Sequence, residues 1–118
     1  MNARPNAWLS QAENDLAQAC FFASQAAEKA LKSALLELGL EPPHTHVLTD
    51  LTATLAASGL DVATLERLPL RRLSRMAISS RYPMDATPPS ELFDRDETDQ
   101  ALDTAAAVIR VLRACDQA

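Results

Sequence analysis

The stretch that decides the fold runs from residue 19 to residue 38 and reads ACFFASQAAEKALKSALLEL. Small and apolar residues recur in it at steps of three and four, the spacing of a buried stripe on an α-helix. They are Phe22, Ala26, Ala27, Ala30, Leu31, Ala34, Leu35 and Leu38. Gly39 follows and accepts the left-handed backbone of a helix C-terminus, and the prolines at 42 and 43 prevent continuation. The stretch predicts one strong helix that packs along one side.

The same periodicity predicts helices over most of the chain, because strand-type alternation is absent and only two glycines are present. Further helices are expected from about residue 5, and at about 46–58, 69–81 and 97–114, with a short turn at 61–68 and a loop at 84–93. We therefore expect a single all-α domain over residues 1–118, an antiparallel four- to five-helix up-and-down bundle. Its expected core is Trp8, Phe22, Leu31, Leu35, Leu51, Leu73, Leu102 and Ile109.

The charge is negative overall and unevenly distributed. The formal net charge is −5 over 118 residues. Residues 67–81 contain five arginines and no acid, whereas residues 85–103 contain seven acids and one arginine. The basic stretch suits a phosphate and the acidic stretch suits a cationic partner, but two solvated helix faces explain the pattern equally well.

Cysteines and apolar runs indicate a cytoplasmic protein. Cys20 and Cys115 have no paired metal spacing, so both are expected to be small buried residues in a reduced compartment. Neither a signal peptide nor an apolar run of membrane-spanning length is visible. No cofactor and no metal site are expected, since a glycine-rich phosphate loop is absent and the His44-x-His46 pair has no obvious third ligand.

Five residues are candidates for a phosphate site. Lys29 and Lys32 lie three apart on one helix edge, His46 stands where a helix begins, and Arg81 and Tyr82 precede a proline-fixed turn. Each has a structural alternative: Lys32 can pair with Glu28 four residues earlier, His46 can anchor its loop, and Arg81 can pair with a nearby acid. Three cations in one cleft would require a phosphate, or a carboxylate such as Glu28, at the centre.

Four elements in order resemble the HEPN family, a nucleotide-binding domain named for its occurrence in higher eukaryotes and prokaryotes. They are Trp8 with Gln11–Leu16, the string Ala23–Lys32, Thr45–Leu48 and Ser80–Pro83. The resemblance implies a helical domain that binds nucleotide or RNA and pairs as a homodimer. It also implies a minimal nucleotidyltransferase as partner, in a two-component or toxin–antitoxin system.

The chain departs from the family pattern between its first two helices. The family has a hairpin there, whereas Leu16-Ala17-Gln18 runs directly into Ala19-Cys20-Phe21. A single helix from Pro5 to Leu38 would be about 50 Å long and could not fold back on itself. We therefore expect that a loop near Gln18 is missing from the chain, and one long helix is the other interpretation.

A second departure concerns activity. RNA-cleaving members of the family carry an arginine followed four to six residues later by a histidine. Here the histidines are His44 and His46, and Arg4 is the sole arginine before them, so the motif cannot form. A binding module is therefore favoured over the two alternatives, which are a metal-independent ribonuclease toxin and a purely structural dimerisation domain.

Overall fold

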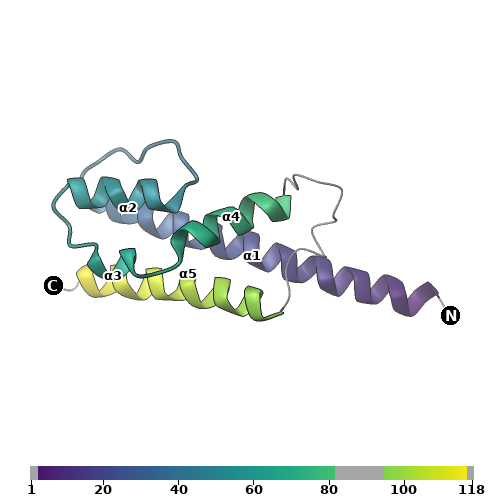
Figure 1. Ribbon diagram of the computed structural model, residues 1–118. Coiled ribbons are helices and arrows are strands. Elements are labelled where there is room, and N and C mark those ends of the chain that lie inside the picture. The colour runs from purple at the N-terminus through teal and green to yellow at the C-terminus, as the bar shows by residue number, and fades with distance from the viewer. Residues whose placement is uncertain (1–2, 82–94, 117–118) are drawn as a thin grey trace.

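The computed structural model describes residues 3–81 and 95–116, and every regular element within these ranges is helical. The elements are α1 (Ala3–Glu37), α2 (Leu48–Ala57), α3 (Ala63–Glu66), α4 (Leu70–Arg81) and α5 (Arg95–Asp116), shown in Figure 1. The predicted all-α bundle is confirmed. The loop expected at 84–93 lies outside the described residues.

Helix α1 is continuous over 35 residues and passes through Gln18 without a loop. The segment from Leu16 to Phe21 contains no glycine or proline, and each of its residues is compatible with a helix interior. At 1.5 Å per residue α1 is about 52 Å long, roughly three times the length of α2 or of α4. The single long helix, which was the other interpretation, is the one that the chain adopts.

Among the side chains of α1 that the structure describes, the buried ones lie in its C-terminal half. Its buried residues are Cys20, Ala23, Ser24, Ala27, Leu31 and Leu35. The N-terminal half extends beyond the other helices (Figure 1), and Trp8 is 66% exposed. Phe22 is 59% exposed because it lies on the side of α1 opposite the buried stripe. The expectation that Trp8 and Phe22 belong to the core is therefore wrong.

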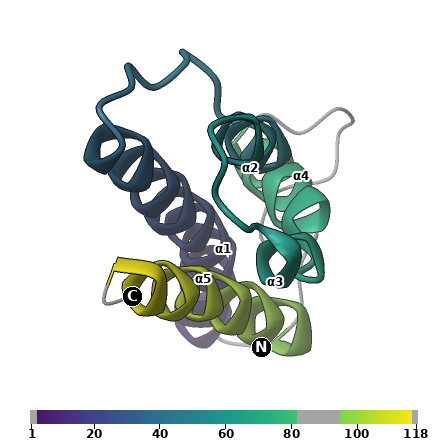
Figure 2. The ribbon, with the colours of Figure 1, turned by 90° about the vertical axis from the view of Figure 1, so that its left-hand side faces the viewer.

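The helix directions do not simply alternate. Cys20 contacts Thr98 near the start of α5, and Leu112 near its end lies beside Ala34, so α5 runs in the same direction as α1. The connection over residues 38–47 carries the chain back along α1, which makes α2 parallel to α1 as well (Figure 1). Helix α4 runs the opposite way. Seen along the bundle, α2 and α4 lie to the right of α1 and α5 crosses the lower end of α1 (Figure 2).

The core combines leucines from every helix but α5 with small residues from α5. Leu31, Leu35, Leu51 and Leu73 are buried as predicted, and Ile109 is half-buried. Leu102 is 47% exposed, which contradicts its predicted place in the core.

Helix α5 is rotated from its predicted orientation because two of its buried positions are polar. Its buried stripe is Thr98, Ala101, Thr104, Ala105, Ala107 and Val108. The Thr98 hydroxyl accepts a hydrogen bond from the Cys20 thiol at 3.5 Å, and the Thr104 hydroxyl donates to the Gln100 carbonyl at 2.8 Å. Because both hydroxyls are satisfied, these threonines are tolerated inside, where a hydrophobic pattern does not place them.

Gly39 ends α1 as the sequence predicts. Its φ is 78°, in the left-handed region, and the N–H groups of Leu40 and Gly39 donate to the carbonyls of Leu35 and Leu36 at 3.0 and 2.9 Å. Carbonyls of the last turn are thereby satisfied, and the chain turns sharply into the connection that leads to α2.

Two leucines that differ in exposure provide a test of this packing. Leu35 of α1 is fully buried and Leu102 of α5 is 47% exposed. Leu35→Ala should lower the free energy of unfolding by about 2–5 kcal/mol, because it leaves a cavity in the core. Leu102→Ala is the matched control and should change the free energy of unfolding by less than about 0.5 kcal/mol. Urea denaturation of both variants measures the difference, and equal effects would contradict the assigned orientations of α1 and α5.

Candidate functional site

His46 is positioned by contacts at the start of α2. The buried Leu48 N–H donates to the Ser74 hydroxyl of α4 at 3.1 Å, which ties the first turn of α2 to α4. The Val47 N–H donates to the Thr45 hydroxyl at 3.1 Å, and that hydroxyl donates to Asp50 at 3.3 Å. These contacts hold the backbone on both sides of His46 in one conformation.

Glu28 of α1 lies between a lysine and His46. Its Oε1 is 2.9 Å from His46 Nδ1, and its Oε2 accepts a hydrogen bond from Lys32 Nζ at 3.1 Å. We call Glu28, Lys32 and His46 the Glu28 cluster. The pairing of Glu28 with Lys32, which was the structural alternative for Lys32, is confirmed, and Glu28 also contacts His46.

The three side chains of the Glu28 cluster differ in their access to solvent. The Glu28 side chain is 14% exposed and that of Lys32 is 26% exposed, whereas that of His46 is 87% exposed. A carboxylate on Nδ1 orients the imidazole and leaves Nε2 available to a ligand. The cluster thus presents an oriented imidazole at the surface above a largely buried ion pair.

The charge of the Glu28 cluster is small. Glu28 and Lys32 cancel, so the cluster carries no net charge with His46 neutral and one positive charge with His46 protonated. A phosphate entering here has to compete with the Glu28 carboxylate for the same two cations.

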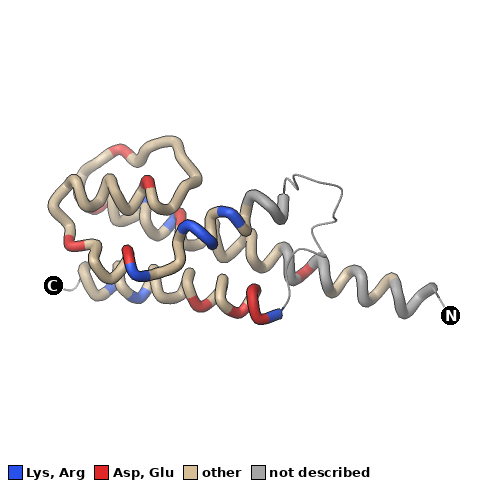
Figure 3. Tube along the Cα trace, viewed as in Figure 1, with Lys and Arg blue, Asp and Glu red and all other residues tan. Residues whose placement is uncertain are grey.

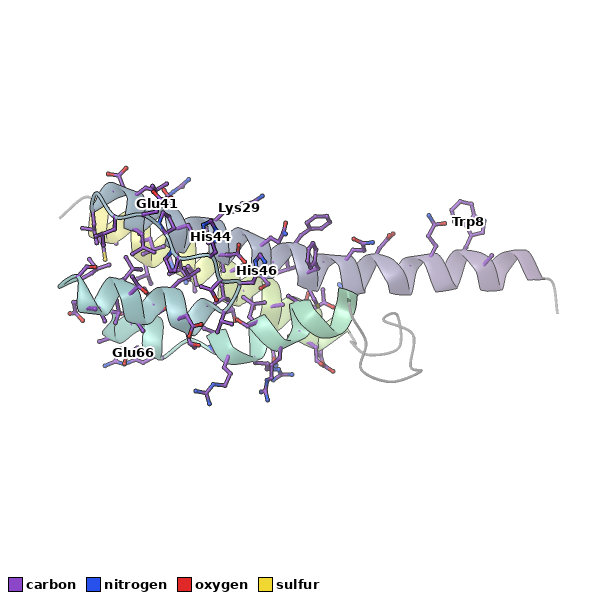
Figure 4. All side chains as sticks on the ribbon, turned by 90° about the horizontal axis from the view of Figure 1, so that it is seen from above. Trp8, Lys29, Glu41, His44, His46 and Glu66 are labelled. Atoms are coloured by element: carbon purple, nitrogen blue, oxygen red, sulfur yellow. The ribbon has the colours of Figure 1, made fainter. Side chains whose placement is uncertain are left out.

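The structure does not bring Lys29 to the Glu28 cluster. Lys29 follows Glu28 by one residue, so it lies about 100° further around the helix. It is exposed and points away from the bundle on the outer side of α1, whereas His46 lies between α1 and the neighbouring helices (Figure 4). Lys29 and Glu28 therefore lie on different sides of α1.

Arg81 is the last residue of α4, and Tyr82 lies outside the described residues. Residue 81 comes seven positions after Ser74 and so falls on the same side of α4, two turns further along. That side contacts the start of α2 through the Leu48–Ser74 hydrogen bond. The backbone of Arg81 is thus about 10 Å along α4 from the contact that positions His46.

The basic and acidic stretches of the sequence face solvent on neighbouring helices. Arg71, Arg72 and Arg75 are exposed along α4, and acidic residues gather at the start of α5 (Figure 3). Arg72 Nη2 lies 3.8 Å from Glu97 Oε2, a half-exposed pair that joins the two stretches. Arg71 and Arg75 form no ion pair with the other residues that the structure describes, so their charge is available to a ligand.

The two cysteines differ from each other. Burial raises the pKa of the Cys20 thiol, with Glu97 adding to the effect and the hydrogen bond to Thr98 opposing it, so Cys20 is an unreactive core residue. Cys115 is exposed, which corrects the expectation that both are buried.

Within residues 3–81 and 95–116, no three metal-binding side chains gather in one place. Among the helices described there, none has the length and apolar character that spanning a membrane requires.

The best-formed cleft lies away from the Glu28 cluster, at the C-terminal ends of α1 and α5. It encloses about 260 Å³ and is mainly apolar, with Glu37 and Arg113 as its charged side chains. Its apolar lining includes Ala30, Ala34, Leu38, Leu60, Ile109 and Leu112. None of the candidate phosphate residues contributes to this cleft.

Comparison with known families decides what kind of domain carries this geometry. A family model for the HEPN domain matches residues 6–115, nearly the whole chain. The chain belongs to the HEPN family. Membership makes this HEPN domain a nucleotide- or RNA-related module at the family level. No curated protein and no solved structure gives a significant match to the chain.

The Leu48–Ser74 hydrogen bond should be required to position His46. Ser74→Ala leaves a fully buried Leu48 N–H without its acceptor, which should cost about 1–3 kcal/mol of stability. Ser58→Ala removes an exposed hydroxyl that donates to the Thr54 carbonyl and is the matched control, with an expected effect below about 0.5 kcal/mol. Urea denaturation gives the stability change, and amide hydrogen exchange at Leu48 shows whether the start of α2 loosens. Unchanged exchange at Leu48 would contradict this role of Ser74.

Proposed function

We propose that this HEPN domain binds the phosphate groups of a nucleotide or an RNA at the Glu28 cluster. The observation that carries the proposal is the 2.9 Å contact between Glu28 and His46. It joins the middle of α1 to the entrance of α2 and places the imidazole beside Lys32. Two nitrogen donors from different elements thereby contact the two oxygens of one carboxylate.

Binding would exchange one anion for another. A phosphate oxygen would accept from protonated His46 and from Lys32 in place of Glu28, and the N-terminal end of α2 adds its partial positive charge. Arg81 and Tyr82 would complete the site from the end of α4, since residue 81 lies on the side of α4 that contacts α2. The exposed arginines of α4 would extend the positive surface along an RNA backbone.

The proposed biological setting follows from family membership. The domain would work in the cytoplasm as a homodimer with a minimal nucleotidyltransferase, in a two-component or toxin–antitoxin system. The exposed acids Asp96, Asp99 and Asp103 of α5 offer a surface for a cationic region of that partner.

A metal-independent ribonuclease is the second candidate, and one observation favours it. Glu28 orients His46 as a carboxylate orients a catalytic imidazole, with the other ring nitrogen directed to solvent. Against it, the chain has no arginine four to six residues before a histidine, so the family's catalytic pair is absent. Binding without cleavage remains the function that the site supports best.

If a phosphate replaces the Glu28 carboxylate, substitutions of neighbouring residues in the Glu28 cluster should change binding in opposite directions. Lys32→Ala and His46→Ala should each weaken binding of a fluorescent short RNA and of ATP by about tenfold, because each removes a charged donor. Glu28→Gln should tighten binding, because it removes the competing carboxylate with little change in size. Arg110→Ala on α5 is the control for loss of one exposed positive charge.

The measurement is fluorescence anisotropy at low and high salt, since binding that neutralises phosphate weakens as salt rises. If Glu28→Gln and Lys32→Ala bind like the unmodified protein, the Glu28 cluster is a structural ion-pair network. If Arg110→Ala loses as much affinity as Lys32→Ala, the RNA or ATP is attracted by the overall charge of the domain and not by a specific site.

The purified domain should not cleave RNA. A general acid–base mechanism needs two groups within hydrogen-bond reach of the reacting phosphate, and the motif that supplies them in ribonuclease members is missing. Incubation with an unstructured RNA, followed by gel electrophoresis, should show intact substrate. Cleavage that persists through repeated purification and disappears in His46→Ala would establish the ribonuclease candidate instead.

A further inference from the structure

The outer face of α1 carries an exposed row of residues that repeats every seven positions. Trp8, Phe22 and Leu36 are 66%, 59% and 60% exposed, although all three are large and apolar. An oppositely charged pair, Asp15 and Lys29, occupies the two positions between them, and both are exposed. Because seven residues make nearly two helical turns, these side chains form one row that drifts around the helix by about 20° per heptad. The row is Trp8, Asp15, Phe22, Lys29 and Leu36.

A line of small residues runs beside this row. Four residues after each of the first four members stand Ala12, Ala19, Ala26 and Ser33. Positions four apart are neighbours on a helix surface, so the small residues flank the large ones along their length. A second helix can therefore approach closely along this face, since the distance between packed helices depends on the side chains at the contact.

The order of residues in the row is self-complementary. Phe22 is midway between Asp15 and Lys29, and also midway between Trp8 and Leu36. If two copies of α1 pack antiparallel with Phe22 near the two-fold axis, Asp15 of each faces Lys29 of the other. The same register places Trp8 of each copy against Leu36 of the other. A parallel register would instead oppose like charges at positions 15 and 29.

The N-terminal half of α1 also needs a partner. From Ala7 to Gln18 every side chain that the structure describes is exposed, and Trp8 is far from the rest of the bundle (Figure 4). A helical segment of this length is marginal in water without packing. In the antiparallel register each projecting segment lies along the C-terminal half of the other copy's α1.

We propose that the outer face of α1 is the dimer interface, with two copies of this chain packed antiparallel about a two-fold axis near Phe22. This rests on the homodimer proposed above and names its surface and register. It does not depend on phosphate binding, because Glu28 and His46 lie on a different side of α1. Lys29, which does not contact the Glu28 cluster, would instead pair with Asp15 of the second copy.

The test is a charge swap across the interface. Asp15→Lys and Lys29→Asp should each raise the dimer dissociation constant about tenfold at low salt, because each creates two like-charge contacts per dimer. The double variant D15K/K29D restores opposite charges in the antiparallel register and should dimerise like the unmodified protein. Glu66→Lys on α3 is the control for reversing an exposed acid elsewhere. Phe22→Glu, at the proposed axis, should give a monomer.

Light scattering across a concentration series measures the dissociation constants without ligand. Emission from Trp8, the single tryptophan, should shift to shorter wavelength as dimer forms. Circular dichroism checks that each variant folds, which is expected because all the substituted side chains are exposed.

Each other outcome overturns a defined part of the proposal. A monomer at tens of micromolar would overturn both the homodimer and this interface. A dimer that is insensitive to Phe22→Glu and to both charge reversals would leave the homodimer standing and overturn the outer face of α1 as its surface. Loss of dimer in Phe22→Glu without rescue in the double variant would overturn the antiparallel register.

Discussion

The continuity of α1 is the constraint on which the rest of the structure depends. Because no residue from Leu16 to Phe21 interrupts it, one helix presents different sides to the core, to the entrance of α2 and to solvent. The buried stripe from Cys20 to Leu35 contacts α2, α4 and α5. A break near Gln18 would allow the N-terminal segment to fold back, and the outer face of α1 would then no longer be one straight row.

The arrangement of charges in the Glu28 cluster also depends on α1. Glu28 and Lys32 are four apart on α1, so they pair within the helix, and the connection over residues 38–47 adds His46 from outside it. The carboxylate is largely withdrawn from solvent, which would be costly without its two partners. A ligand phosphate would replace Glu28 as the anion that the cations share, so removing the carboxylate should favour the ligand.

The angular separation of Glu28 and Lys29 divides α1 between two roles. A difference of one residue turns the side chain by about 100°, enough to move it from the side facing α2 to the outer face. Lys32 falls back toward Glu28 and joins its cluster. Glu28 and Lys29, adjacent in sequence, therefore belong to a proposed phosphate site and to a proposed dimer interface, and Lys32 lies where the two border each other.

Much of the local structure could be predicted from the sequence. The stripe that includes Leu31 and Leu35, the end of α1 at Gly39 and the pairing of Glu28 with Lys32 all depend on neighbours within a few residues. The string from Ala23 to Lys32 also led to the HEPN family, which the match over residues 6–115 confirms. Such features are visible in sequence because helical periodicity and capping are short-range properties.

Tertiary structure alone decided how the helices face one another. The orientation of α5 depends on Thr98 and Thr104, whose hydroxyls find partners in Cys20 and the Gln100 carbonyl, so polar residues are buried while Leu102 is exposed. The exposure of Trp8 depends on how far α1 extends past its neighbours, and the contact of His46 with Glu28 depends on the path of residues 38–47. A single-helix pattern carries none of this information, because each outcome is set by a partner that is distant in sequence.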